Sequence, residues 1–157
     1  DTQKLFLIVG VIKEARGNGK RIYIFGNGGS SSTASHFASD LAKGCGCRAF
    51  CLNDPVPALT AWANDRGYAD VFDSQLEKLV DEGDVVIGIS GSGNSANVID
   101  GVVMAKNKGA ITIGLTAFGG GQLKDVVDYP VIVPVKDMEQ AEDVHLMICH
   151  MIKKELL

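Results

Sequence analysis

The chain contains the segment Ile22-Tyr-Ile-Phe-Gly-Asn-Gly-Gly-Ser30, and its pattern recurs in Val86-Ile-Gly-Ile-Ser-Gly-Ser-Gly-Asn-Ser95. Each segment is a short apolar run that ends in a turn of glycine, serine and asparagine, and a helical pattern follows each turn. A strand, a turn and a helix form the repeating unit of α/β proteins with a parallel sheet. Such sheets bind ligands at the carboxyl ends of their strands, beside a topological switch point. The two turns therefore predict one shared ligand site.

Outward from these segments, apolar runs alternate with helical patterns along the chain. The runs are apolar throughout, which is typical of parallel strands covered on both faces. The predicted strands are Arg21–Phe25, Arg48–Leu52, Val85–Ile89, Ile111–Leu115 and Pro130–Val135. The predicted helices are one that ends before Gly17 and four over Ser31–Lys43, Tyr68–Val80, Ala96–Lys108 and Glu139–Leu157. This order predicts one doubly wound α/β domain over residues 1–157, with a five-stranded parallel sheet flanked by helices.

The composition excludes several classes of function. The formal net charge of −4 argues against a nucleic-acid-binding protein, because binding phosphate backbones requires an excess of Lys and Arg on some face. No apolar run approaches the roughly 20 residues of a membrane span. The apolar stretch Leu5–Ile12 lacks the basic flank and the cleavage site of a signal peptide. We therefore expect a soluble, cytoplasmic protein that binds neither nucleic acid nor membrane.

Three of the four cysteines, Cys45, Cys47 and Cys51, cluster in the sequence, and the fourth is Cys149. A zinc knuckle is one interpretation of the cluster. Its C-x-C-x3-C spacing is not a usual structural-zinc pattern, and no histidine lies nearby in the sequence. Reduced thiols are the favoured interpretation, because cysteine is among the residues most often buried.

The two turns have the composition of a phosphate-binding site. Backbone N–H groups at the start of a helix bind phosphate with the help of the helix dipole. The hydroxyls of Ser90, Ser92 and Ser95 add donors, and the glycines let the backbone approach closely. The turns match neither a Walker A loop nor the G-x-G-x-x-G of dinucleotide-binding proteins. The alternative is an ordinary glycine-rich turn with serine helix caps, but two turns of matching pattern favour phosphate binding.

Two of the predicted helices carry both carboxylates and histidines. His36 and Asp40 are four residues apart and share a helix face. Glu142 and His150 are eight residues apart, about 80° around a helix, so both are predicted to face one neighbouring site. Together the four offer two nitrogens and two oxygens, a set suitable for zinc or a similar divalent ion. The alternative is a surface His–Asp pair, a carboxylate placed at a helix start, and histidines packed in the core.

Four segments, in chain order, carry a family resemblance: Gly26-Asn-Gly-Gly-Ser-Ser-Ser-Thr-Ala-Ser-His-Phe-Ala-Ser-Asp40, Asn64-Asp-Arg-Gly-Tyr-Ala-Asp-Val-Phe72, Gly88-Ile-Ser-Gly-Ser-Gly-Asn-Ser-Ala-Asn-Val98 and Glu142-Asp-Val-His-Leu-Met-Ile-Cys-His150. They resemble the phosphoheptose isomerases of the sugar isomerase (SIS) superfamily. The resemblance implies a flavodoxin-like SIS domain that converts sedoheptulose 7-phosphate to a glycero-manno-heptose 7-phosphate. It also implies a homotetramer with active sites at subunit interfaces.

The resemblance further implies roles for individual residues. The phosphate is expected at Ser30, Ser90, Ser92 and Ser95, the rest of the substrate at Asn27, Gly28 and Asp65, and a divalent metal, zinc above all, at His36, Asp40, Glu142 and His150. The expected reaction runs through an enediol: a base removes a proton beside the carbonyl, an acid returns one to the neighbouring carbon, and the metal polarises the oxygens. Asp40 or Glu142 is the expected base and His150 the expected acid.

Four substitutions separate the chain from the family pattern. Asp40 stands where the family usually has glutamate, Glu142 replaces a glutamine, Gly91 replaces a threonine, and Thr33 replaces an aspartate. These changes leave open which carboxylate is the base. They also keep a second function open, that of a non-catalytic SIS module which binds a sugar phosphate as a sensor or as a protein-interaction scaffold. Acids and histidines at all four metal positions favour the enzyme.

Overall fold

The computed structural model describes residues 2–157. At its centre lies a parallel sheet with the strand order β2-β1-β3-β4-β5. The strands are β1 (Arg21–Gly26), β2 (Arg48–Cys51), β3 (Val85–Ser90), β4 (Ile111–Thr116) and β5 (Tyr129–Ile132). The chain runs from β1 outward to β2 and then crosses back to β3, so the order reverses between β1 and β3. The predicted doubly wound, flavodoxin-like fold is confirmed, and its switch point separates the two strands that carry the small-residue turns.

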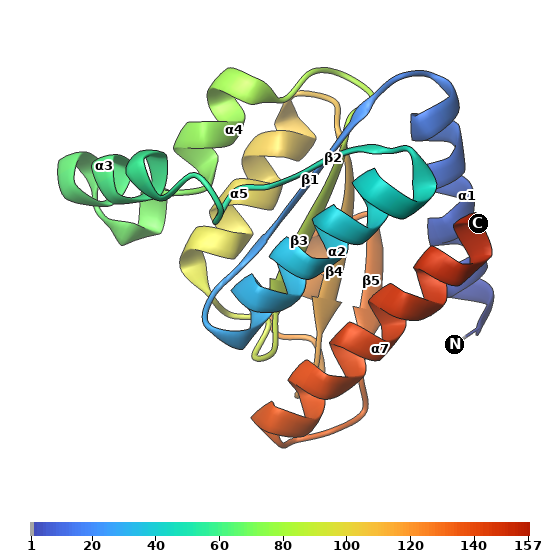
Figure 1. Ribbon diagram of the computed structural model, residues 1–157. Helices are drawn as coiled ribbons and strands as arrows, with labels where there is room; N and C mark the ends of the chain where they lie inside the picture. Colours follow the sequence, from blue (N-terminus) through green and yellow to red (C-terminus); the bar gives the residue numbers. More distant parts are fainter. Residues whose placement is uncertain (1) are drawn as a thin grey trace.

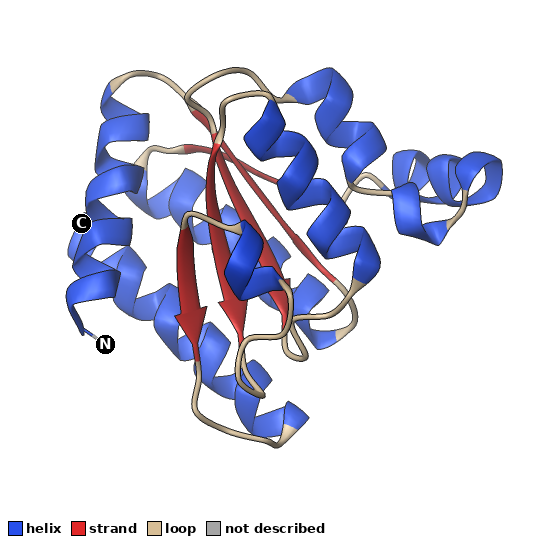
Figure 2. Ribbon diagram, turned by 180° about the vertical axis from the view of Figure 1, so that it is seen from behind, coloured by secondary structure: helices blue, strands red, loops and turns tan. Residues whose placement is uncertain are grey.

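Helices cover both faces of the sheet and make a three-layered molecule (Figure 1, Figure 2). One face is covered by α1 (Thr2–Gly17), α2 (Gly29–Cys45) and α7 (Met138–Leu156), and the other by α4 (Asp73–Leu79), α5 (Ala96–Asn107) and α6 (Leu123–Val126). Side chains of β1 alternate between the two layers, as the pleat of a strand requires: Ile22 and Ile24 join the first core, and Tyr23 and Phe25 the second. No helix in the described residues is long and apolar enough to cross a membrane.

The structure departs from the predicted helices between β2 and β3. Helix α3 (Val56–Arg66), which the sequence does not predict, forms there and projects from the body (Figure 1), and the helix predicted over Tyr68–Val80 is divided into the 3-10 helix η1 (Tyr68–Asp70) and α4. No residue of α3 is buried, so its sequence carries no clear apolar stripe. The four-residue α6 is too short to produce a periodic pattern.

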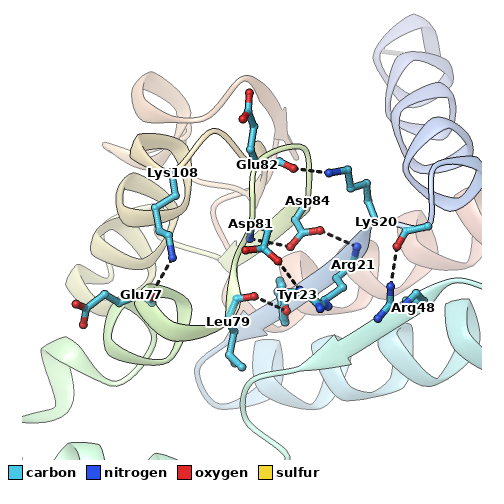
Figure 3. Close-up of polar contacts among 11 residues, drawn as sticks. Lys20, Arg21, Tyr23, Arg48, Glu77, Leu79, Asp81, Glu82, Asp84 and Lys108 are labelled. Atoms are coloured by element: carbon cyan, nitrogen blue, oxygen red, sulfur yellow. Dashed lines mark hydrogen bonds and ion pairs between the residues drawn. The ribbon is translucent and has the colours of Figure 1, made fainter.

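Hydrogen bonds connect the amino end of β1 with the segment that leads into β3 (Figure 3). The buried Asp84 carboxylate accepts N–H bonds from Arg21 at 2.8 Å and from Asp81 at 2.9 Å. The Tyr23 hydroxyl donates to the Leu79 carbonyl at 2.9 Å. These contacts satisfy backbone groups at this edge of the sheet, and the small-residue turns lie at the opposite edge.

Candidate functional site

The two small-residue turns share one cavity of about 270 Å³ at the carboxyl ends of β1 and β3. This phosphate pocket, as we call it, includes every predicted phosphate-binding serine. It is lined by Asn27, Gly28, Ser30, Ile89, Ser90, Gly91, Ser92, Ser95, Met138 and Glu142. Its lining in the described chain includes no lysine or arginine, so an anion there must be held by hydroxyls, N–H groups and helix dipoles.

The turn after β3 is held by the loop that follows β4. Ala117 donates its N–H to the Gly91 carbonyl at 2.8 Å, and Leu123 donates to the Gly93 carbonyl at 2.9 Å. Gly93 has a φ of 68°, and a Cβ there would collide with the backbone of Gly120. Only glycine fits this position, because both the dihedral angle and the close backbone contact exclude a side chain. The Oγ atoms of Ser90 and Ser95 lie 3.0 Å apart inside the turn so formed.

Glu142 reaches the phosphate pocket from α7. Its carboxylate lies against Gly29, the first residue of α2, so closely that a Cβ at Gly29 would overlap it. Helix α2 begins after Gly28, which has no side chain to cap it. A carboxylate at a helix start is favoured by the positive end of the helix dipole. Glu142 therefore lies at the amino end of α2 and lines the phosphate pocket.

A second group of candidate residues lies where α2 and α7 pack side by side (Figure 1). His36 Nε2 lies 3.1 Å from His150 Nε2 and 3.4 Å from Asp40 Oδ2. The distance from His150 Nε2 to Asp40 Oδ2 is 3.8 Å. These three residues, the His–Asp group, have ligand atoms that all lie within 4.8 Å of one another.

The His–Asp group fits a metal ion in its donor atoms and their spacing. A tetrahedral zinc ion with ligands at about 2.0–2.1 Å holds them about 3.3–3.4 Å apart, close to the separations found here. Asp40 Oδ2 is buried and has no hydrogen-bond partner. Lys153 Nζ donates to the other oxygen, Oδ1, at 2.6 Å. This hydrogen bond lowers the pKa of Asp40 below its ordinary value, although burial acts in the opposite direction.

Comparison with known proteins finds similar sequences and structures over most of the chain. Residues 2–117 match the SIS domain family. The chain is 40% identical over 156 residues to a phosphoheptose isomerase of Geobacter metallireducens, an alignment that covers 96% of this chain and 82% of that protein. The structure of phosphoheptose isomerase GmhA from Neisseria gonorrhoeae superimposes with a TM-score of 0.93 at 32% identity, over 98% of this chain and 85% of that chain. The chain belongs to the phosphoheptose isomerase family of SIS domain proteins. A phosphoheptose isomerase structure from Francisella tularensis is similar as well, with a TM-score of 0.91 at 25% identity over 98% of this chain and 85% of that chain.

Two predicted site residues of this SIS domain lie apart from the His–Asp group. Glu142 is in the phosphate pocket, because eight residues along α7 place it about 12 Å from His150. The angular argument from the sequence omitted this rise. Asp65 lies exposed in the last turn of α3, where its Oδ1 accepts a hydrogen bond from Asn64 at 2.9 Å.

Sequence reasoning missed three polar residues around the site. Lys153 binds Asp40, and Asn97 and Tyr68 bind Asn27. Lys153 follows His150 by three residues on the same helix, which is a signal that could have placed it near the group. The contacts of Asn97 and Tyr68 join distant parts of the chain and leave no local pattern.

A larger hollow of about 950 Å³ lies along β2 between α2 and α4. Its lining includes none of the predicted site residues. The clustered cysteines are free and buried, and burial raises the pKa of Cys51 to about 11. The predicted site residues other than Asp65 lie in the phosphate pocket and the His–Asp group.

Proposed function

We propose that this phosphosugar isomerase converts sedoheptulose 7-phosphate to a glycero-manno-heptose 7-phosphate. Membership of the phosphoheptose isomerase family supplies the class of reaction. The observation that carries the proposal is that two serine-rich turns converge on one pocket at the switch point. The His–Asp group lies farther along α2, the helix that begins at the first of these turns.

The spacing along α2 supports a long substrate. Gly29 at the pocket and His36 in the His–Asp group are seven residues apart, or roughly 10 Å along a helix. In a ketose 7-phosphate the carbonyl and the phosphate stand at opposite ends of the carbon chain. A substrate anchored by its phosphate in the pocket therefore extends its reacting carbons toward the His–Asp group.

The acid and the base are assigned from their positions. Asp40 and His150 lie side by side, as groups that exchange protons with neighbouring carbons must, and we assign Asp40 as base and His150 as acid. Glu142, about 12 Å along α7 from His150, would bind substrate and fix the start of α2. The phosphate would be held by Ser30, Ser90, Ser92 and Ser95. Asn27, Gly28 and Asp65 would bind the rest of the substrate, with Asn27 and Asp65 near the sugar hydroxyls.

A divalent metal, zinc by its donor set, would be held by His36, Asp40 and His150. When bound, it supplies Lewis-acid polarisation of the substrate's carbonyl and hydroxyl oxygens. Lys153 lowers the pKa of Asp40 by binding Oδ1, and it leaves Oδ2 directed toward the two imidazoles.

We further propose a cytoplasmic homotetramer with active sites at subunit interfaces. The exposed apolar side chains of Phe6 and Leu7 on α1 and of Met147 and Met151 on α7 support an assembly that covers these helices. Sedimentation of the purified protein tests the oligomeric state, and a monomer at micromolar concentration would contradict it.

The function is tested by incubating the protein with sedoheptulose 7-phosphate and measuring the aldose formed. We expect turnover by the wild type and its loss in His150→Gln, while inorganic phosphate binding is kept. Metal analysis of the wild type and of a His36→Ala/His150→Ala variant accompanies the assay. Absence of turnover on any ketose phosphate, together with intact phosphate binding, would instead support the non-catalytic SIS module.

A further inference from the structure

Asn27 is held by the side chains of Asn97 and Tyr68. Its Nδ2 donates to Asn97 Oδ1 at 2.9 Å, and Asn97 Nδ2 donates back to Asn27 Oδ1 at 3.0 Å. The Tyr68 hydroxyl donates to the same Oδ1 at 2.8 Å. Asn97 is only 4% exposed, so its amide is fixed by its surroundings. The three side chains form what we call the amide latch.

The amide latch connects the turn after β1 with the start of α5, on the two sides of the switch point. Asn27 belongs to the turn after β1, and Asn97 is the second residue of α5, just after the turn that follows β3. Their reciprocal hydrogen bonds therefore hold the two turns of the phosphate pocket at a fixed separation. They also fix what Asn27 offers to a ligand. Its oxygen already accepts two hydrogen bonds and its nitrogen donates one, so one N–H remains to donate into the pocket.

Tyr68 connects the latch to the arm, by which we mean residues 56–70 of α3 and η1. The arm carries Asp65 and packs on the body only through half-buried apolar side chains such as Leu59 and Trp62. Among the side-chain hydrogen bonds of the described chain, the one from Tyr68 to Asn27 alone ties the arm to the rest of the molecule. Gly67, with a φ of 106°, separates α3 from η1.

We infer that Asn97 and Tyr68 are positioning residues for the isomerase reaction: they hold Asn27 as a hydrogen-bond donor to the substrate, and they tie the Asp65 arm to the phosphate pocket. The inference rests on the proposed function for its kinetic effect but not for its structural effect. The proposed function puts Asn27 and Asp65 at the sugar and the serines at the phosphate. Losing the Tyr68 hydrogen bond should therefore impair sugar positioning, whereas the Asn27–Asn97 pair continues to hold the two turns of the phosphate pocket.

The kinetic test compares Tyr68→Phe with Tyr23→Phe, which removes a different hydroxyl with one hydrogen bond to the Leu79 carbonyl. Losing one neutral hydrogen bond is expected to lower kcat/KM for sedoheptulose 7-phosphate about tenfold in Tyr68→Phe, with the Kd for inorganic phosphate unchanged. Tyr23→Phe should leave both constants at their wild-type values. Equal kinetics in the two variants would overturn the inference.

Coupling to Asn27 separates positioning from a general structural role. In an Asn27→Ala background, Tyr68→Phe and Asn97→Ala should have no further effect on kcat/KM, because they act through the missing amide. Full additivity of the losses would overturn the inference.

Hydrogen exchange gives a readout that needs no turnover. The amides of the arm should exchange faster in Tyr68→Phe than in the wild type or Tyr23→Phe, with those of α2 unchanged. Identical exchange of the arm in all three proteins would refute its attachment through Tyr68. If the wild type isomerises no sugar phosphate, the proposed function fails, and the exchange result still decides whether the latch holds the arm.

Discussion

Replacing Gly29 with alanine tests whether the Glu142 carboxylate lies at the start of α2. A Cβ at Gly29 would occupy the space of that carboxylate. The carboxylate belongs to the free end of a flexible side chain, so it would move away rather than break the fold. The variant should therefore lose the favourable interaction between Glu142 and the helix dipole while it gains the better helix propensity of alanine.

The two effects are of similar size and opposite sign. Alanine in place of glycine stabilises a helix by up to about 1 kcal/mol. A carboxylate at a helix start contributes typically 0.3–1 kcal/mol, or about 2 kcal/mol in favourable, partly buried positions. Gly29→Ala should leave the free energy of unfolding nearly unchanged in the wild type and raise it by about 1 kcal/mol in Glu142→Ala. The expected coupling between the two positions is thus about 1 kcal/mol.

Urea unfolding followed by circular dichroism, at one protomer concentration throughout, measures the four free energies. Gly10→Ala is the matched control, because Gly10 lies inside α1 and its Cβ would meet no atom within 4 Å. It should stabilise the wild type and Glu142→Ala equally. If Gly29→Ala also stabilises both backgrounds by the same amount, the carboxylate is not at the start of α2 and the reasoning is wrong.

Three further predictions follow from the pKa shifts. Lys153→Met should cost about 2 kcal/mol of stability at pH 7, and because the lysine lowers the pKa of Asp40, the difference from wild type should shrink as the pH falls below 3.8, as urea unfolding at both pH values would show. Burial lowers the pKa of His145 below 6.5, so the wild type should lose up to about 1.4 kcal/mol of stability per pH unit below 6.5; a pH series of urea unfolding should show a smaller slope for His145→Leu. Iodoacetamide at pH 8 should modify Cys51 only after unfolding, since its buried thiol has a pKa of about 11, and mass spectrometry of native and urea-treated protein checks this.

Much of the fold was predictable because its signals are local. The five strands appear as apolar runs, and the strand–turn–helix pattern around Ser30 and Ser95 is enough to place two turns at one edge of a parallel sheet. His36 and Asp40 were paired correctly because four residues of helix fix their relation. Helix α3 was not predicted because none of its side chains is fully buried, so that no clear periodic pattern marks it.

The contacts of the site were less predictable because they are long-range. Lys153 meets Asp40 across 113 residues, and Asn97 meets Asn27 across 70. Such pairs are set by the packing of α7 on α2 and of α5 on the sheet, and a single sequence contains no record of that packing. For Glu142, helix spacing predicted the direction of the side chain but not its distance from His150.

The glycines around the phosphate pocket differ in whether they can be replaced by a larger residue. Gly29 faces the side chain of Glu142 and Gly91 faces that of Met138, so a larger residue at either glycine can be accommodated when the partner changes too. Gly93 faces the backbone of Gly120, and no substitution can shorten a backbone. Positions 29 and 142, and likewise 91 and 138, can therefore change together without disturbing the backbone. The contact between the turn after β3 and the loop after β4 cannot be changed in this way, because a Cβ at Gly93 would meet the backbone of Gly120 and a Cβ at Gly121 would meet the backbone of Gly93. A protein that keeps this contact must therefore keep glycine at both 93 and 121.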